Sequence, residues 1–326
     1  MRSNVRATLL GLTALIAAWA PPAARAEDAF PSRVVRLVVP AASGSTTDTI
    51  ARLLAEKLGR TWSQSVIVEN ISGGAMNTGA EHVAKAAPDG YTLMVTPPSP
   101  VSINHLLYSD LNYDPRKFTA VALLAKIPNA LVVRNDLPAK DVQELIAFAK
   151  ANPGKLSFGS QGAGSTAHLS ASQLEVLAGI KMVHVPYRGA LPALNDVIAG
   201  HIDMFFDTLT TSVPQWRAGK VRILAVAGPE RNASVPELPT VAEAALPGFE
   251  VNNWVGFFAP ARTPPDIVQR WNGETLRIMQ SPEIQARLPN EGARFIPMTP
   301  EQFGAFVKSE IAKWAPVVKA SGARVD

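Results

Sequence analysis

Hydrophobic positions near the start of the chain alternate between short apolar runs and helical spacing. Residues 34–39 (VVRLVV) predict a buried strand that ends at Pro40. After a loop of small and polar residues, apolar side chains recur at i, i+3, i+4 and i+8 and predict a helix that ends at Gly59: Ile50, Leu53, Leu54 and Leu58. Residues 66–68 and 91–96 predict two more strands, separated by a glycine-bearing loop at 70–79 and a short helix at 80–87.

The second half repeats this order of elements. A strand at 155–159 leads into another loop of small and polar residues, and a helix follows that ends at Gly179 with Leu169, Val176 and Leu177 on one face. The remaining predicted elements are strands at 182–185, 202–206 and 221–227 and a helix at 191–199. This alternation predicts an α/β fold with mostly parallel sheets and helices on both faces.

Two apolar stretches, 127–133 and 254–260, are the expected crossings between two lobes. The tail after them (265–279, 281–288 and 300–321) is mostly helical and is expected to return to the first lobe. The predicted organisation is therefore a first lobe of residues 27–126 plus 252–326 and a second lobe of residues 127–251. Ligands of α/β sheets bind at the carboxyl ends of strands, so the cleft should contain both small-residue loops. With the two crossings as the only links, hinge closure is expected.

The first 26 residues predict a secretory signal peptide. Arg2 and Arg6 precede an apolar run at 7–20, and Ala24-Arg25-Ala26 forms a cleavage motif. The run is shorter than the roughly 20 residues that span a bilayer. The alternative is an anchor that stays uncleaved. The sequence favours cleavage after Ala26 and a mature chain that is free in the periplasm.

Composition narrows the functional classes. The 326 residues are 47% apolar and 18% charged, which is typical of a folded protein larger than one average domain. The formal net charge is +4, but three of the cations lie in the predicted signal peptide, so binding of nucleic acid by bulk charge is not expected. The absence of cysteine excludes disulfides, thiolate metal sites, cysteine nucleophiles and a lipid anchor on cysteine.

The two loops, residues 40–47 (the first loop) and 160–166 (the second loop), carry the main chemical signal. Each opens a helix whose first N–H groups have no intrahelical acceptor and whose dipole adds partial positive charge. Either loop could therefore bind a carboxylate without a lysine or arginine. The alternative is that Thr46, Thr47, Ser165 and Thr166 only cap their helices.

Other chemistries lack support. Residues 162–167 match a dinucleotide pattern, but His184 stands near the end of the next strand, where an acidic residue is expected. There is no G-x-S-x-G motif, and the five histidines are too far apart for a metal-binding helix face. We expect no cofactor, metal or catalytic residue. His168 could contact a ligand or support the helix cap, and Asp207 could bind a ligand or cap the segment at 208–213.

Several motifs resemble those of the Bug family, the TctC-like periplasmic solute-binding proteins of tripartite tricarboxylate transporters. They are V-V-P-x-x-x-G-x-x-x-D at 38–48, V-E-N at 68–70, A-P-D-G-Y-T-L at 87–93, H-V-P-Y-R-G at 184–189, L-P-T-V-A-E at 238–243 and W-x-G at 254–256. The resemblance covers the mature chain in order. It implies a type II periplasmic-binding-protein fold in which two lobes close on a small carboxylate held by backbone amides and bridging waters.

The resemblance also implies the ligand-binding residues. In the first lobe these are Pro40, Ala41, Ala42, Ser43, Gly44, Ser45, Thr46, Asn77, Thr96 and Ser99. In the second lobe they are Ser160, Ala163, Gly164, Ser165, Thr166, His168, Arg188, Gly189, Ala190 and Asp207.

Three departures from the family pattern bear on the ligand. Ser45 replaces a glycine, Ala75-Met76 interrupts a glycine-rich stretch, and Pro97-Pro98 replaces a small or polar pair. Prolines supply no N–H donors and Met76 is apolar, so this wall is less suited to a second or third carboxylate. We therefore expect one tightly held carboxylate on a compact apolar or aromatic body, rather than a citrate-like acid.

The favoured function is capture of a small carboxylate and its delivery to membrane transporter subunits, by a monomer that is not an enzyme. Two alternatives remain open. One is an exported α/β enzyme of the lyase or isomerase type acting on a carboxylic acid, for which His168 and Asp207 are the candidate pair. The other is the ligand-binding domain of a sensor, which shares the fold.

Overall fold

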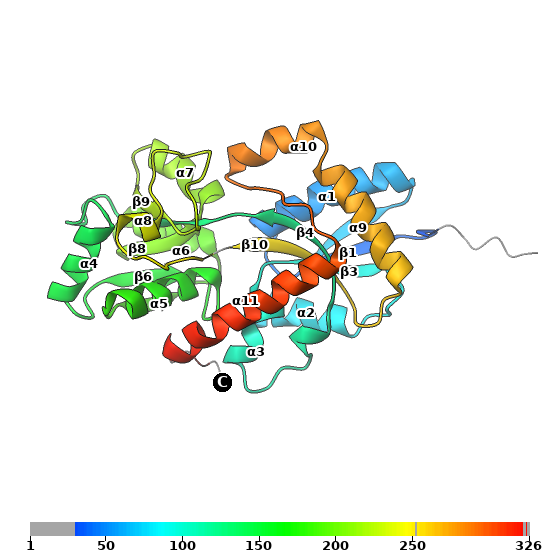
Figure 1. Ribbon diagram of the computed structural model, residues 1–326, viewed down its shortest axis with the longest axis horizontal. Helices are drawn as coiled ribbons and strands as arrows, with labels where there is room; N and C mark the ends of the chain where they lie inside the picture. Colours follow the sequence, from blue (N-terminus) through cyan, green and yellow to red (C-terminus); the bar gives the residue numbers. More distant parts are fainter. Residues whose placement is uncertain (1–29, 252, 322–323, 325–326) are drawn as a thin grey trace, which may run out of the picture.

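The computed structural model describes residues 30–251, 253–321 and 324, so the predicted signal peptide lies outside the described residues. Two five-stranded sheets form the framework (Figure 1). The first sheet has the order β2 (Val66–Asn70), β1 (Val35–Val39), β3 (Thr92–Thr96), β10 (Trp254–Ala259) and β4 (Thr119–Lys126). The second has the order β7 (Val183–Pro186), β6 (Ser157–Ser160), β8 (Met204–Thr208), β5 (Asn129–Val133) and β9 (Arg222–Val226).

Strand direction follows one scheme in both sheets. β1 is parallel to β2 and β3, and β6 is parallel to β7 and β8. The strands that follow the crossings, β10 and β5, run antiparallel to their neighbours. Both sheets are thus mostly parallel near the loops, and one antiparallel strand in each returns the chain from the other lobe.

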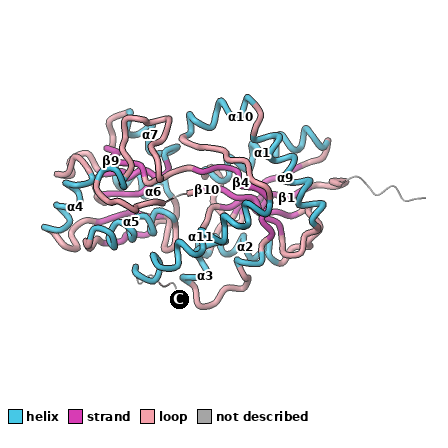
Figure 2. Tube along the Cα trace, viewed as in Figure 1, coloured by secondary structure: helices cyan, strands magenta, loops and turns pink. Residues whose placement is uncertain are grey.

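Helices cover both faces of the sheets (Figure 2). Those of the first lobe are α1 (Thr46–Trp62), α2 (Asn77–Ala84), α3 (Asn104–Leu107), α9 (Pro265–Met279), α10 (Pro282–Arg287) and α11 (Pro300–Ser321). Those of the second are α4 (Val142–Ala151), α5 (Thr166–Ala178), α6 (Ala190–Ala199), α7 (Leu209–Arg217) and α8 (Val241–Ala244). Short helical turns lie at η1 (Gly74–Met76), η2 (Ser99–Ile103), η3 (Pro115–Lys117) and η4 (Leu288–Glu291). The predicted α/β fold with two lobes is confirmed.

Several predicted elements need correction. α1 passes Gly59 and ends at Trp62, because the left-handed turn that stops it is at Ser63 (φ 52°). Val176 and Leu177 do not face the core and are 50% and 44% exposed. The stretches 127–133 and 254–260 are not linkers, because β5 and β10 within them are buried sheet strands. The first link is shorter, at 127–128 between β4 and β5, and the second reaches the first lobe just before β10 starts at Trp254.

Two further segments tie the lobes together. The first segment is η2 and α3, which follow β3. Their last residues, Ile103 and Leu107, pack into the hydrophobic core of the second lobe. α11 starts in the first lobe with Phe303 and ends with Trp314 and Val318 in the core of the second. A helix of its 22 residues is about 33 Å long, and Figure 1 shows it running from the first sheet toward α5. The expectation that the crossings are the only links was wrong.

Within the described residues, no helix has the length and apolar character needed to cross a membrane.

Candidate functional site

The sheet topology brings both loops to edges that face each other. In the first sheet Thr96, at the end of β3, pairs with Gly256 near the start of β10. In the second sheet Thr208, at the end of β8, pairs with Asn129 at the start of β5. The links between the lobes therefore join the edges at which the parallel strands end. The first loop follows β1 and the second loop follows β6 at these same edges.

The first loop is a tight turn that leads into α1. Gly44 has a left-handed backbone (φ 81°), and the Ser45 hydroxyl accepts a hydrogen bond from the N–H of Asp48 at 3.2 Å. The Asp48 carboxylate in turn accepts from the N–H of Gly44 at 2.9 Å. Ser45 has φ −69°, so this position needs no glycine conformation, and the serine caps the helix.

A buried polar network fixes this turn. Asp48 accepts from Arg52 at 3.0 Å and from the Asn70 amide at 2.9 Å, and the same amide donates to the carbonyl of Ala41 at 3.1 Å. Burial opposes ionisation of Asp48, but the hydrogen bonds from Arg52, Gly44 and Asn70 outweigh it and lower the pKa of its carboxyl. Ala42, Ser43 and Gly44 remain exposed, so the tip of the loop is open to a ligand.

The second loop has the same geometry. Gly164 is left-handed (φ 79°), the Ser165 hydroxyl accepts from the N–H of His168 at 3.3 Å, and the N–H of Gly164 donates to Nδ1 of His168 at 3.2 Å. His168 thus occupies the place that Asp48 has in the first loop. The predicted repetition of strand, loop and helix extends to individual hydrogen bonds. His168 does support the helix cap, which was one of its two predicted roles.

Both helices start with free amide positions. Thr46 and Thr47 are the first two residues of α1, and Thr166 and Ala167 are the first two of α5. N–H groups at these positions have no acceptor within the helix. The Gly164 N–H, in contrast, is already used by His168. The geometry can therefore offer a carboxylate two helix N-termini rather than the amide of Gly164.

Contacts between the lobes bring several predicted residues together. The Ser99 hydroxyl donates to the carbonyl of Gly164 at 3.1 Å, and a Cβ added at Gly164 would lie 2.1 Å from Cδ1 of Leu107. Asn104 donates to the side-chain oxygen of Asn77 at 2.6 Å. Ser99, Asn77 and the second loop are thus neighbours, through Asn104 and Leu107, which sequence reasoning did not identify. Neither residue belongs to a recognisable motif.

The remaining predicted residues are more scattered. Thr96 is buried and its hydroxyl bonds the carbonyl of Pro97 at 3.1 Å. Ser160 is buried, with its hydroxyl 2.6 Å from Nε2 of His184. Arg188, Gly189 and Ala190 lie at the end of β7, the edge strand, where Gly189 caps α6. Arg188 is exposed and pairs with no carboxylate of the described chain.

Asp207 is fully buried beneath α7. Its Oδ2 accepts from the Thr211 hydroxyl at 2.6 Å, and Oδ1 has no partner within the described residues. Burial raises the pKa of Asp207 to about 7. The side chain therefore supports the first turn of α7, in keeping with the capping alternative, and does not reach the surface in this conformation.

The glycine-rich stretch that contains Ala75 and Met76 keeps a glycine-like backbone. Ala75 has φ 51° and Met76 has φ 75°, values that favour glycine. Ala75 and Met76 thus carry side chains on a backbone conformation that glycine would adopt more easily. Pro98, in contrast, has helical backbone angles, φ −56° and ψ −36°. Its carbonyl accepts a hydrogen bond from the N–H of Ser102 at 2.8 Å. Pro98 thus begins the helical turn η2, whose end reaches the core of the second lobe.

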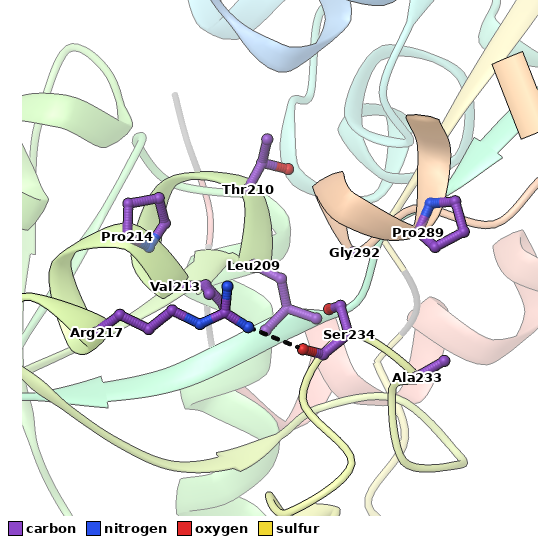
Figure 3. Close-up of a pocket in the computed structure, with 9 residues that line it drawn as sticks. All are labelled: Leu209, Thr210, Val213, Pro214, Arg217, Ala233, Ser234, Pro289 and Gly292. Carbon is purple, nitrogen blue, oxygen red and sulfur yellow. Dashed lines mark hydrogen bonds between the residues drawn. The ribbon is translucent and has the colours of Figure 1, made fainter. Parts of the chain in front are cut away.

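A pocket of about 530 Å³ lies between the lobes (Figure 3). Its lining comes from α7, from the loop at 233–234 and from the η4 region: Leu209, Thr210, Val213, Pro214, Arg217, Ala233, Ser234, Pro289 and Gly292. The Asn232 amide donates to the carbonyl of Gly292 beside it, at 2.9 Å. None of the predicted site residues lines this pocket. Both lobes supply its walls.

The described residues contain no group of three or more His, Cys, Asp or Glu side chains that could hold a metal ion.

Two α/β lobes with matched helix N-termini at their facing edges are typical of periplasmic solute-binding proteins. The model of the tripartite tricarboxylate transporter family receptor matches residues 50–323. The chain belongs to this family, and the resemblance to Bug and TctC-like proteins is confirmed. It is a solute-binding receptor of that transporter class.

Relatives and solved structures agree with this assignment. BugT of Bordetella pertussis is 31% identical over 91% of this chain and 92% of its own length. The structure of Rpa4515 of R. palustris with adipate has a TM-score of 0.86 and 38% identity, and covers 91% of this chain and 100% of its own. MatC of Rhodopseudomonas palustris with bound malate has a TM-score of 0.82 and 37% identity, with coverages of 89% and 100%.

Proposed function

We propose that this protein captures a small carboxylate between its lobes and delivers it to the membrane subunits of a tripartite transporter. The observation that carries the proposal is the pair of loops with one hydrogen-bond geometry, which places the N-termini of α1 and α5 at facing edges. The adipate and malate in two similar structures support a carboxylate as the ligand.

The two helix ends are sufficient for useful affinity. Each dipole contributes about 0.3–1 kcal/mol to a carboxylate, and each charge-assisted hydrogen bond about 1.5–3 kcal/mol. Micromolar binding requires about −8 kcal/mol. Four such bonds from the first turns of α1 and α5 and the exposed tip of the first loop would supply it. Within the residues 40–47 and 160–166 no lysine or arginine is available or needed.

The ligand proposal is one carboxylate held by the two loops, with an apolar body against the wall formed near Met76 and Pro97. Adipate fits this description better than citrate does, because an alkyl chain separates its carboxylates. An aromatic acid such as benzoate fits as well. Arg188 is the one arginine among the predicted site residues that could meet a second carboxylate, but it lies just after β7, the edge strand of the second lobe.

The remaining parts of the proposal concern the processing, location, oligomeric state and lobe boundaries of the protein. It is cleaved after Ala26, acts as a free monomer in the periplasm, and binds no nucleic acid, metal or cofactor. The lobes comprise residues 27–126 plus 252–326 and residues 127–251, and the protein releases its ligand unchanged. Intact mass and sedimentation of the exported protein check the cleavage site and the monomer.

Titration calorimetry with benzoate, adipate, malate and citrate under identical conditions tests the function. We expect at least one of the four to bind with a Kd in the micromolar range or below, and benzoate or adipate to bind more tightly than citrate. Tighter citrate binding would contradict the ligand proposal. Chromatography of each acid after long incubation separates the rival function, since recovery of a changed acid would indicate a lyase or isomerase.

A further inference from the structure

Two histidine rings lie against each other beneath the second loop. The centroids of His168 on α5 and His184 on β7 are 4.3 Å apart. Phe158 of β6 stacks on His184 with a centroid distance of 4.9 Å. His168 is 7% exposed, and His184 is half-buried. The rings therefore form a packed layer between the second sheet and the loop.

The hydrogen bond to Gly164 defines the protonation state of His168. Nδ1 accepts the N–H of Gly164, so it carries no proton and the neutral ring has its proton on Nε2. Protonation of Nδ1 would place one donor against another. Burial, and then the charge of a protonated His184, lower the pKa of His168 to about 4. Burial also lowers the pKa of His184.

Each ring holds one glycine amide of the second loop. His168 holds the N–H of Gly164 directly. His184 acts through Ser160, whose hydroxyl lies 2.6 Å from Nε2 of His184 and accepts the N–H of Gly162 at 3.0 Å. The Ser160 and Ser165 hydroxyls also bond the carbonyl of Gly162, at 3.1 and 2.8 Å. The loop backbone is thus linked to one imidazole directly at Gly164 and to the other through Ser160 at Gly162.

The first loop shows why a neutral ring suits this position. There Asp48 holds the N–H of Gly44, and Arg52 compensates its negative charge. No residue of the second loop forms an ion pair within the described chain, and neither do the stacked rings of His168, His184 and Phe158. A carboxylate in place of His168 would therefore add an unpaired negative charge beside a helix N-terminus that, on the proposed function, receives an anion. The imidazole makes the same hydrogen bond without that charge.

We propose that His168 and His184 act as a neutral positioning pair that fixes the second loop, so that protonation of His168 releases the loop and weakens carboxylate binding. His184 is the titratable group that acts on His168, while Phe158, Ser160 and the loop present no charge to the rings. The effect on affinity rests on the proposed function. The protonation state and tautomer of the two rings do not.

Nuclear magnetic resonance of the ligand-free protein tests the pair directly. With labelled histidine, we expect His168 to show the neutral tautomer protonated on Nε2 down to about pH 4, far below the ordinary imidazole value of about 6.5. The Gly164 amide signal should shift together with the His168 ring. A ring that titrates near 6.5, or that is protonated on Nδ1 when neutral, would overturn the proposal.

Three variants separate positioning from packing, with adipate as the probe. His168→Asn retains an acceptor at a position where Asp48 shows that a shorter side chain reaches the glycine N–H, so its affinity at pH 7 should stay within about threefold of wild type. His168→Leu fills space without an acceptor and should bind about tenfold more weakly or worse. His184→Phe keeps the ring layer but loses the bond to Ser160, and should fall between the two.

The pH dependence of adipate affinity distinguishes a titrating histidine from one that only fills space, because a space-filling role does not change with pH. Ionisation of adipate itself cancels in the ratio of the wild-type Kd to the His168→Asn Kd. This ratio should rise about twofold by pH 4 and about fourfold by pH 3.5, as expected for a group with a pKa of about 4. His201→Gln, at an exposed site paired with Asp196, is the matched control and should follow wild type. A constant ratio would contradict the proposal.

The two arms distinguish the possible failures. If adipate does not bind, the proposed ligand is wrong, and the resonance arm alone decides the histidine pair. If adipate binds but the rings titrate normally, the proposed function stands and the positioning pair is overturned.

Discussion

Asp48 and His168 occupy equivalent places in the two loops but solve the same problem with different charge. Each accepts the N–H of a left-handed glycine, Gly44 or Gly164, and each is preceded by a capping serine. Asp48 is ionised and paired, whereas His168 is neutral. Small polar residues at a strand end predicted both turns, but the partner of each glycine emerges only when the side chains four positions later are placed.

Asp207 makes stability depend on pH in an unusual direction. Its folded pKa of about 7 lies above the ordinary value of 3.8, so its contribution to stability is full below pH 3.8 and is lost as the pH rises through 7. Asp207→Asn cannot ionise. At pH 8 the variant should therefore exceed wild type in unfolding free energy by on the order of a few kcal/mol, relative to the difference at pH 4.

Urea unfolding of both proteins at pH 4, 6 and 8 measures this difference. Thr211→Val serves as a second variant, because it removes the hydroxyl that stabilises the carboxylate and should steepen the loss of stability with rising pH. A wild-type minus Asp207→Asn difference that stays constant from pH 4 to 8 would contradict the buried, protonated state.

Gly164 is constrained more by its neighbour than by its backbone. Both Gly162 and Gly164 have positive φ, but a Cβ at Gly162 meets nothing within 4 Å, whereas one at Gly164 meets Leu107 at 2.1 Å. Gly162→Ala should cost about 1–3 kcal/mol from backbone strain alone. Gly164→Ala should cost clearly more, because Leu107 is packed in the core and must move.

Thermal unfolding of the two variants compares the costs, and Leu107→Ala provides the rescue. Gly164→Ala with Leu107→Ala should be less destabilised than the sum of the two single changes, since the smaller side chain makes room for the added methyl group. Additive effects would place Leu107 away from Gly164 in solution. Gly164→Asp would disturb the packing against Leu107 and also add a negative charge to the loop. It is therefore a poor probe of carboxylate binding alone.

At the scale of elements, the sequence pattern of the mostly helical tail predicted α9 and α11 with the bounds that the structure has, Pro265–Met279 and Pro300–Ser321. It was less successful where an apolar run is continuous. β5 is buried at all five positions, and such a run is compatible with a strand, a core helix or a linker until its neighbours are known. β4 and α4 were missed altogether. The end of α1 was also misplaced, because tertiary packing of α1 against β2 and α9 carries the helix through Gly59.

α11 connects the lobes as well as covering the first sheet. Trp314 is fully buried in the second-lobe core, while Phe303 on the same helix is fully buried against Trp254 in the first lobe. Truncating either side chain to alanine should cost about 3–5 kcal/mol. The two substitutions should therefore have similar costs in stability, but only the one at Trp314 removes a contact between α11 and the second lobe. Phe303→Ala is thus the control for Trp314→Ala.

At the scale of the whole molecule, the extra ties predict a limited hinge motion. Small-angle scattering should show a smaller radius of gyration with bound carboxylate than without it. Ligand-free Trp314→Ala should show a larger radius than ligand-free wild type, and Phe303→Ala should match wild type. An unchanged profile on binding of a proven ligand would count against closure. Equal radii for both variants would mean that α11 does not restrain the lobes.

The sequence by itself determined the class of protein. Strand, small-residue loop and helix follow one another at short range, and hydrophobic spacing and turn residues encode such local order directly. It also placed the two loops at strand ends and supplied the motifs that revealed the family. These signals need no knowledge of which distant residues meet.

The tertiary structure decided how the site is held. Ser160 meets His184, Ser99 meets Gly164, and Asn77 meets Asn104 across separations of 24, 65 and 27 residues. Residue spacing carries no information on such contacts, because they depend on strand order and on how the two lobes close. The additional ties through Leu107 and Trp314 were hidden for the same reason: an apolar side chain shows in the sequence that it will be buried, but only packing determines in which lobe.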